Sequence, residues 1–191
     1  MAVSFFNKSE GLGVMKTYCA FLRGVNVNGK TMKMAEACDV LKQAGLAGAV
    51  SVLASGNLIF QSDRPQSELR GLLERALSEH YNDDVHLFIK SSDEVSVILT
   101  SVPYNEDSGL HIYTFICEAG FEDVLLKEFM KITPSDKESA EIQNGLFYWR
   151  CRKGATLDSG FSKILGRKDM KEKFTSRNIG TIAKIVAKMN I

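Results

Sequence analysis

Three short segments of the 191-residue chain combine arginine, asparagine, glycine and serine in a way that suits ligand binding. They are Arg23-Gly-Val-Asn26, Ser55-Gly-Asn57 and Thr175-Ser-Arg-Asn178. A guanidinium binds carboxylate or phosphate groups, glycine lets the backbone approach a ligand closely, and asparagine supplies amide donors. The chemistry that these residue types indicate is the binding of an anion.

Each segment also has an ordinary explanation in turn chemistry. Glycine, asparagine and serine are the usual residues of strand-to-helix loops and hairpins, which accounts for most of residues 23–26 and 55–57. Thr175 or Ser176 is expected to cap a helix, and this puts Arg177 in the first turn, where the helix dipole disfavours a cation. Such a position is explained if Arg177 holds an anion. The alternative is an arginine that points into solvent.

The chain has a net charge of +1, but its basic residues are concentrated at the C-terminal end. Residues 150–191 hold eleven lysines and arginines and three acidic residues, a net charge of +8, which leaves −7 for residues 1–149. Such asymmetry indicates an anionic partner for the basic segment, either a small molecule or a nucleic acid. A basic tail packed beside an acidic body explains it equally well.

The sequence contains no recognisable motif for a cofactor or a metal, and no segment typical of a membrane span. Its four cysteines include no CxxC motif and its three histidines have no metal-ligand spacing, so we expect reduced thiols, no metal and no cofactor. No apolar run reaches the ~20 residues of a membrane span, and residues 1–14 lack the hydrophobic stretch of a secretory signal. These features predict a cytoplasmic protein without a membrane partner. P-loop, GxSxG and Rossmann motifs are also absent, so no catalytic residue is identified.

The elements that position the three segments follow from hydrophobic periodicity. Strands are predicted where strand-forming apolar residues run together, at residues 18–25, 50–54, 58–61 and 85–89. Helices are predicted where apolar residues recur at helical spacing, at residues 34–44 and 65–77. This order is the split βαβ or ferredoxin-like arrangement. The short link at residues 55–57 predicts a hairpin.

The second half of the chain repeats this order of elements. The expected elements are a helix at 92–99, a strand at 111–117, a helix at 122–131, strands at 140–142 and 146–151 around Asn144-Gly145, a helix at 159–165, and a last helix that is capped by Thr175 or Ser176 and runs to residue 189. The fold class is therefore α+β, with duplicated ferredoxin-like subdomains, mainly antiparallel sheets and a C-terminal helix. The expected divisions are an N-terminal extension (1–15), a first subdomain (16–91), and a second subdomain with basic C-terminal helices (92–191).

Taken together, the segments resemble the DUF1697 family of uncharacterised bacterial proteins. The resemblance covers roughly residues 16–189 and rests on the order and spacing of residues 22–30, 53–60, 162–163 and 175–178. It implies a duplicated ferredoxin-like fold in a cytosolic protein and no known reaction. The chain departs from the family pattern at Asn28, which replaces a glycine, and at Ile179 and Gly180, which stand where tryptophan and asparagine are usual. These departures weaken any ligand role that rests on a ring or an amide there.

The residues that match the family pattern are the candidate ligand-binding residues: Arg23, Asn26, Ser55, Asn57, Lys163, Arg177 and Asn178. The leading hypothesis is a module that binds an anionic ligand, a nucleotide or a nucleic-acid phosphate, between the two subdomains. The alternatives are an enzyme of transfer or hydrolysis chemistry, and a structural role in which the loops bond to one another. The sequence carries no signal for the oligomeric state.

Overall fold

The first half of the chain forms a four-stranded antiparallel sheet with two helices on one face. The computed structural model describes residues 14–105, 107–134, 138–156 and 159–190, so the predicted extension lies outside the described residues as far as residue 13. The elements are β1 (Lys16–Leu22), α1 (Met34–Gln43), β4 (Ala47–Ser51), β5 (Asn57–Ser62), α2 (Gln66–Tyr81) and β6 (Leu87–Ser91). Their strand order is β4-β5-β1-β6, and every pairing is antiparallel.

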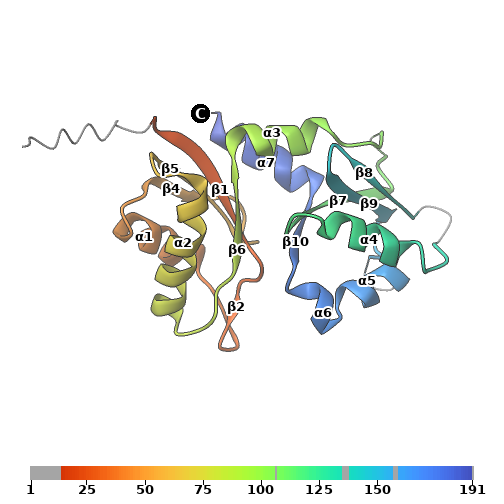
Figure 1. Ribbon diagram of the computed structural model, residues 1–191, viewed down its shortest axis with the longest axis horizontal. Helices are drawn as coiled ribbons and strands as arrows, with labels where there is room; N and C mark the ends of the chain where they lie inside the picture. Colours follow the sequence, from red (N-terminus) through yellow and green to blue (C-terminus); the bar gives the residue numbers. More distant parts are fainter. Residues whose placement is uncertain (1–13, 106, 135–137, 157–158, 191) are drawn as a thin grey trace, which may run out of the picture.

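The second half forms another antiparallel sheet, with its own helices on one face (Figure 1). Its elements are β7 (Leu110–Cys117), α4 (Phe121–Phe129), β8 (Ser139–Gln143), β9 (Leu146–Arg152), α5 (Gly160–Leu165), α6 (Lys168–Lys171) and β10 (Phe174–Asn178). The strand order is β10-β7-β9-β8. The core of this half includes the aromatic side chains of Phe115, Phe147 and Phe161.

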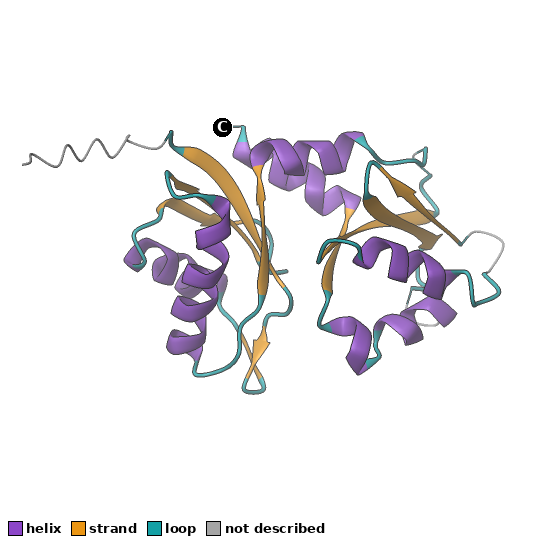
Figure 2. Cartoon of the chain, viewed as in Figure 1, coloured by secondary structure: helices purple, strands orange, loops and turns teal. Residues whose placement is uncertain are grey.

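Two further helices connect the halves. They are α3 (Ser92–Thr100) and α7 (Ile179–Met189), which pack on each other and lie between the sheets at one end of the molecule (Figures 1 and 2). Both cover the face of the first sheet that α1 and α2 leave open, because Val95 and Ile98 of α3 and Ile182 of α7 share a buried cluster with residues of β1. The C-terminal helix therefore returns to the first half of the chain.

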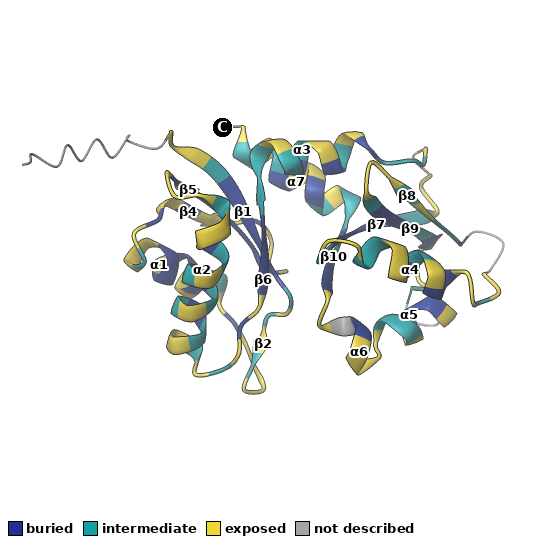
Figure 3. Cartoon of the chain, in the orientation of Figure 1, coloured by how far each residue is buried: buried dark blue, intermediate teal, exposed yellow. Residues whose placement is uncertain are grey.

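Burial on both faces explains the uninterrupted apolar run of β1. Side chains alternate across a strand, so Tyr18 and Leu22 pack under α1 and α2, whereas Cys19 and Phe21 pack under α3 and α7. Figure 3 shows buried positions along the strands and exposed positions on the outer sides of α1, α2 and α4. The chain is thus a mixed α+β protein with mainly antiparallel sheets and a C-terminal helix. No helix in the described ranges is both long and apolar enough to cross a membrane.

Several predicted elements are confirmed with small shifts at their ends. The strand predicted at 85–89 is observed at Leu87–Ser91, and the one predicted at 50–54 is observed at Ala47–Ser51. The hairpin at Asn144-Gly145 is confirmed, with φ of 52° and 72° at its two turn residues. A small hairpin of β2 (Asn26–Val27) and β3 (Lys30–Thr31) was not predicted.

The predicted start of the last helix is wrong. Helix α7 begins at Ile179 and is capped by Asn178, whose Oδ1 accepts a hydrogen bond from the Gly180 N–H at 2.8 Å. Arg177 therefore lies in strand β10 and not in a helical first turn. The physical reason is tertiary, because β10 pairs with β7 as far as Asn178 and Thr175 bonds to the carbonyl of Leu22 instead of capping a helix.

Candidate functional site

Arg177 is buried where the two halves of the chain meet. Its side chain carries a full charge, yet the residue is only 7% exposed. All five of its N–H donors are used: Nε donates to Asn57 Oδ1, Nη1 to Thr175 Oγ1 and the Ser176 carbonyl, and Nη2 to the carbonyls of Leu22 and Gly56. We call this set of contacts the arginine junction.

The arginine junction ties β10 to the ends of β1 and β5. The Leu22 carbonyl lies 2.8 Å from Arg177 Nη2 and 3.1 Å from the hydroxyl of Thr175, so it accepts two hydrogen bonds from the second half. The Gly56 carbonyl lies 3.1 Å from the same Nη2. The Gly56 carbonyl also accepts from the Leu22 N–H at 2.8 Å, so Arg177 is a second donor to each of these two carbonyls.

The charge of Arg177 is stabilised by neutral polar groups. Among the described residues no carboxylate pairs with it, and its contacts are the oxygens above and the ring of Phe21, whose centroid lies 5.6 Å from the guanidinium carbon. Burial lowers the pKa of Arg177 to about 10, which still leaves it charged at neutral pH. Burial also raises the pKa of the nearby Cys19 thiol well above its usual range, so that thiol supplies no counter-charge.

Asn57 and Ser55 complete the link between β4 and β5. Asn57 is fully buried and donates from Nδ2 to the Val52 carbonyl at 2.9 Å and to Ser55 Oγ at 3.0 Å. The side-chain oxygen of Asn57, Oδ1, accepts a hydrogen bond from Arg177 Nε. Two of the three sequence segments therefore meet each other, and they do so inside the protein.

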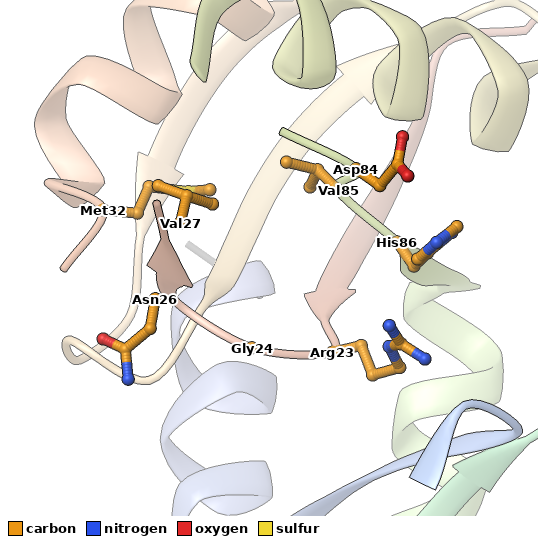
Figure 4. A pocket seen from close by; sticks show the side chains of 8 residues that line it. All are labelled: Arg23, Gly24, Asn26, Val27, Met32, Asp84, Val85 and His86. Atoms are coloured by element: carbon orange, nitrogen blue, oxygen red, sulfur yellow. The ribbon is translucent and has the colours of Figure 1, made fainter. Parts of the chain in front are cut away.

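Arg23 lies one residue beyond β1 and lines a separate cavity of about 270 Å³ (Figure 4). Its backbone N–H donates to the His86 carbonyl at 2.9 Å, which continues the pairing of β1 with β6. No acceptor in the described part of the chain binds its guanidinium. We call this space the Arg23 cavity; its lining residues are Arg23, Gly24, Asn26, Val27, Met32, Asp84, Val85 and His86.

The Arg23 cavity combines polar and apolar walls. Val27, Met32 and Val85 supply apolar surface, and Figure 4 shows Arg23 and His86 on the opposite side from Val27 and Met32. His86 Nδ1 lies 3.7 Å from Glu74 Oε1, a distance at which the two attract each other when the imidazole is protonated. The cavity thus offers a small ligand the guanidinium of Arg23, the imidazole of His86, the carboxylate of Asp84 and an apolar wall.

Asn26 belongs to the β2–β3 hairpin at the edge of the cavity. It is exposed, and its Oδ1 accepts a hydrogen bond from Thr31 Oγ1 at 3.2 Å. Asn28, at the tip of the hairpin, donates from its backbone N–H to Asp83 Oδ2 at 2.8 Å. Asn28, one of the residues that depart from the family pattern, therefore anchors this hairpin to the loop after α2.

Lys163 and Asn178 lie elsewhere. Lys163 is exposed on α5. Asn178 Nδ2 lies 3.1 Å from His111 Nδ1 and lines a different cavity of about 520 Å³. The seven predicted residues therefore fall into four places: the arginine junction (Arg177 and Asn57) with Ser55 bonded to Asn57, the Arg23 cavity (Arg23 and Asn26), Lys163, and Asn178.

Several residues of the junction and the cavity are not predicted from the sequence. The sequence predicts Thr175 as a helix cap and not as a partner of Leu22. Asp84, Val85 and His86 belong to no motif, and they lie near Arg23 only because β6 pairs with β1. No local signal in the sequence could have found them. Within the described ranges, no three His, Cys, Asp or Glu side chains gather as a metal ion would require.

Comparison with known proteins identifies a family and a solved structure of similar fold. The DUF1697 family, described as proteins of unknown function, matches residues 15–148. The fold is similar to that of the conserved bacterial protein SP0830 from Streptococcus pneumoniae, with a TM-score of 0.76 and 22% identity over 93% of this chain and 99% of that one. No curated protein matches the chain.

Proposed function

The chain belongs to the DUF1697 family of proteins of unknown function, and we propose that it is a binding module for a small anion held at Arg23. One observation carries the proposal: Arg23 lines a cavity, and its guanidinium has no acceptor among the described residues. The other motif arginine, Arg177, has no donor left for a ligand. The proposed site therefore lies at the end of β1.

The size of the cavity limits the ligand. A volume of about 270 Å³ is slightly below the ≈300–1,000 Å³ of pockets that enclose drug-sized molecules. It suits a phosphate or carboxylate group on a small body that contacts the apolar wall. A nucleotide would bind through its phosphate and leave its base outside.

The basic C-terminal segment gives less support to a nucleic acid. Three of its eleven basic residues serve internal contacts: Arg177 is buried, Arg167 pairs with Glu128 and Asp169, and Lys173 pairs with Glu118. We therefore favour a small molecule as the partner.

The test is a titration of the full chain with inorganic phosphate and with AMP, followed by NMR of the backbone amides. We expect shifts at Gly24 and His86, and about a tenfold weaker affinity for Arg23→Ala because a charge-assisted hydrogen bond is lost. Lys163→Ala is the control and removes an exposed charge elsewhere on the chain. Equal affinity in the wild type and Arg23→Ala would refute the proposal.

A second candidate function, catalysis, is favoured by the position of His86. The imidazole lines the cavity with Arg23 and has Glu74 behind its Nδ1, an arrangement in which a histidine acts as a base and an arginine stabilises developing charge. A suitable assay is hydrolysis of p-nitrophenyl phosphate. Catalysis at this site requires that His86→Gln lose turnover while still binding phosphate.

Asn57, Ser55 and Arg177 have, in our proposal, a structural role. Their hydrogen bonds are to one another and to backbone carbonyls, and they connect the two halves. Binding and structure are thereby divided between two neighbouring sets of motif residues.

We also infer that each half is a ferredoxin-like unit, with boundaries at 16–91 and 92–191. Support comes from the order strand-helix-strand-strand-helix-strand in each half. The two sheets also share one spatial order. Across each sheet, the strands of that half follow in the order second, third, first, fourth. The free thiols of all four cysteines support a reducing compartment, and we propose the cytoplasm.

A further inference from the structure

The peptide group between Leu22 and Arg23 is held from both sides. Its N–H, on Arg23, donates to the His86 carbonyl at 2.9 Å. Its oxygen, on Leu22, accepts from Arg177 Nη2 at 2.8 Å and from Thr175 Oγ1 at 3.1 Å. The first bond comes from the first half and the other two come from β10. The orientation of the backbone that carries Arg23 is therefore set by both halves.

Close packing leaves this segment little room to relax. The Gly56 carbonyl accepts hydrogen bonds from the Leu22 N–H at 2.8 Å and from Arg177 at 3.1 Å. A Cβ atom on Gly56 would lie 2.8 Å from Leu22 Cβ and 2.9 Å from Val25 Cγ1. Leu22 and Val25, on either side of Arg23-Gly24, thus pack closely against Gly56, whose carbonyl belongs to the arginine junction.

Arg177 lies outside the Arg23 cavity. All its donors are occupied, it is 7% exposed, and it does not line the Arg23 cavity. Its charge meets no carboxylate among the described residues, and a buried charge is poorly screened. It therefore adds positive potential next to Leu22, the residue before Arg23.

We propose that Arg177 is a positioning residue for the anion site at Arg23, so that the second half of the chain sets the affinity of a cavity built by the first. This inference rests on the proposed function. Such supporting contacts matter because a binding side chain is only as well placed as the backbone that carries it.

The test compares Arg177→Lys with Arg152→Lys. The first keeps the charge, but a single ammonium cannot reach all the acceptors of the guanidinium. The second makes the same change at an exposed residue of β9. The measurements are the affinity for inorganic phosphate and the hydrogen exchange of the Arg23 amide, which reports the bond to His86 without any ligand.

We expect Arg177→Lys to bind phosphate about fivefold more weakly, within the range of residues that act on a site from a distance. The Arg23 amide should exchange faster, and Arg152→Lys should match the wild type in both measurements. A folded Arg177→Lys with wild-type affinity and wild-type exchange overturns the positioning role alone. A wild type that binds no phosphate overturns the proposed function, and the positioning role with it.

Thr175→Val decides the question if Arg177→Lys does not fold. It removes one of the two bonds to the Leu22 carbonyl, and the hydroxyl that accepts from Arg177 Nη1, with little change of shape. Thr181→Val, at a partly exposed position of α7, is the matched control. We expect about a twofold loss of phosphate affinity for Thr175→Val. Wild-type affinity in that variant would overturn the proposal.

Discussion

Replacing Arg177 by methionine tests how strongly the arginine junction holds the two halves. The substitution keeps an unbranched side chain but removes five hydrogen bonds. The acceptors are affected unequally. The Leu22 carbonyl keeps Thr175 and the Gly56 carbonyl keeps the Leu22 N–H, whereas Asn57 Oδ1 is left with no donor among the described residues.

The expected loss follows from these partners. A buried acceptor without a donor costs about 1–3 kcal/mol, and each hydrogen bond from a charged donor contributes about 1.5–3 kcal/mol. Removing the charge also removes the penalty of keeping it away from water, which offsets several of those bonds. We therefore expect Arg177→Met to lose about 2–4 kcal/mol of unfolding free energy, a large part of the ~5–15 kcal/mol typical of a folded domain.

Urea unfolding at neutral pH measures the loss. Arg152→Met is the control, because an exposed arginine should change the unfolding free energy by less than about 0.5 kcal/mol. A double-mutant cycle with Asn57→Ala isolates the contact between the two side chains, and we expect a coupling of about 1 kcal/mol or more. Losses equal to that of the control, together with zero coupling, would show that the junction does not stabilise the protein.

Two further predictions concern the backbone and pH. Gly56→Ala should destabilise the protein by about 2–4 kcal/mol, because φ at Gly56 is +76° and the new Cβ would lie 2.8 Å from Leu22 Cβ. Gly24→Ala is the control: it has open space around it and should have little effect on the unfolding free energy in the same assay. Partial burial alone would raise the pKa of Glu94, but the ammonium of Lys90 at 2.8 Å helps to lower it overall. The stability that the Glu94 carboxylate contributes is then present at neutral pH and lost as pH falls below about 4. The wild type should therefore exceed Glu94→Gln in unfolding free energy at pH 7 and lose that excess at low pH. A constant difference in unfolding free energy from pH 7 to 3 would contradict this.

Local sequence patterns were sufficient for most of the secondary structure. The hairpin at Asn144-Gly145 was predictable because both residues accept positive φ, and the stripe through Ile182 marked the C-terminal helix. These features depend on residues close together in the chain. The joint order of the segments around Arg23, Asn57 and Arg177 also indicated the family, which the match over residues 15–148 confirms.

The division of roles among the motif residues depended on tertiary structure. Arg177 reaches Leu22, 155 positions away, and Asn57, 120 positions away, and these contacts keep it in a strand and use up its donors. The guanidinium of Arg23 faces the cavity because β1 ends beside His86, where none of the residues that the structure describes accepts a hydrogen bond from it. The sequence by itself determined which residue types are present and which local elements they form. Which arginine is buried and which faces a cavity was decided only by folding, because a buried guanidinium requires acceptors that distant strands bring together.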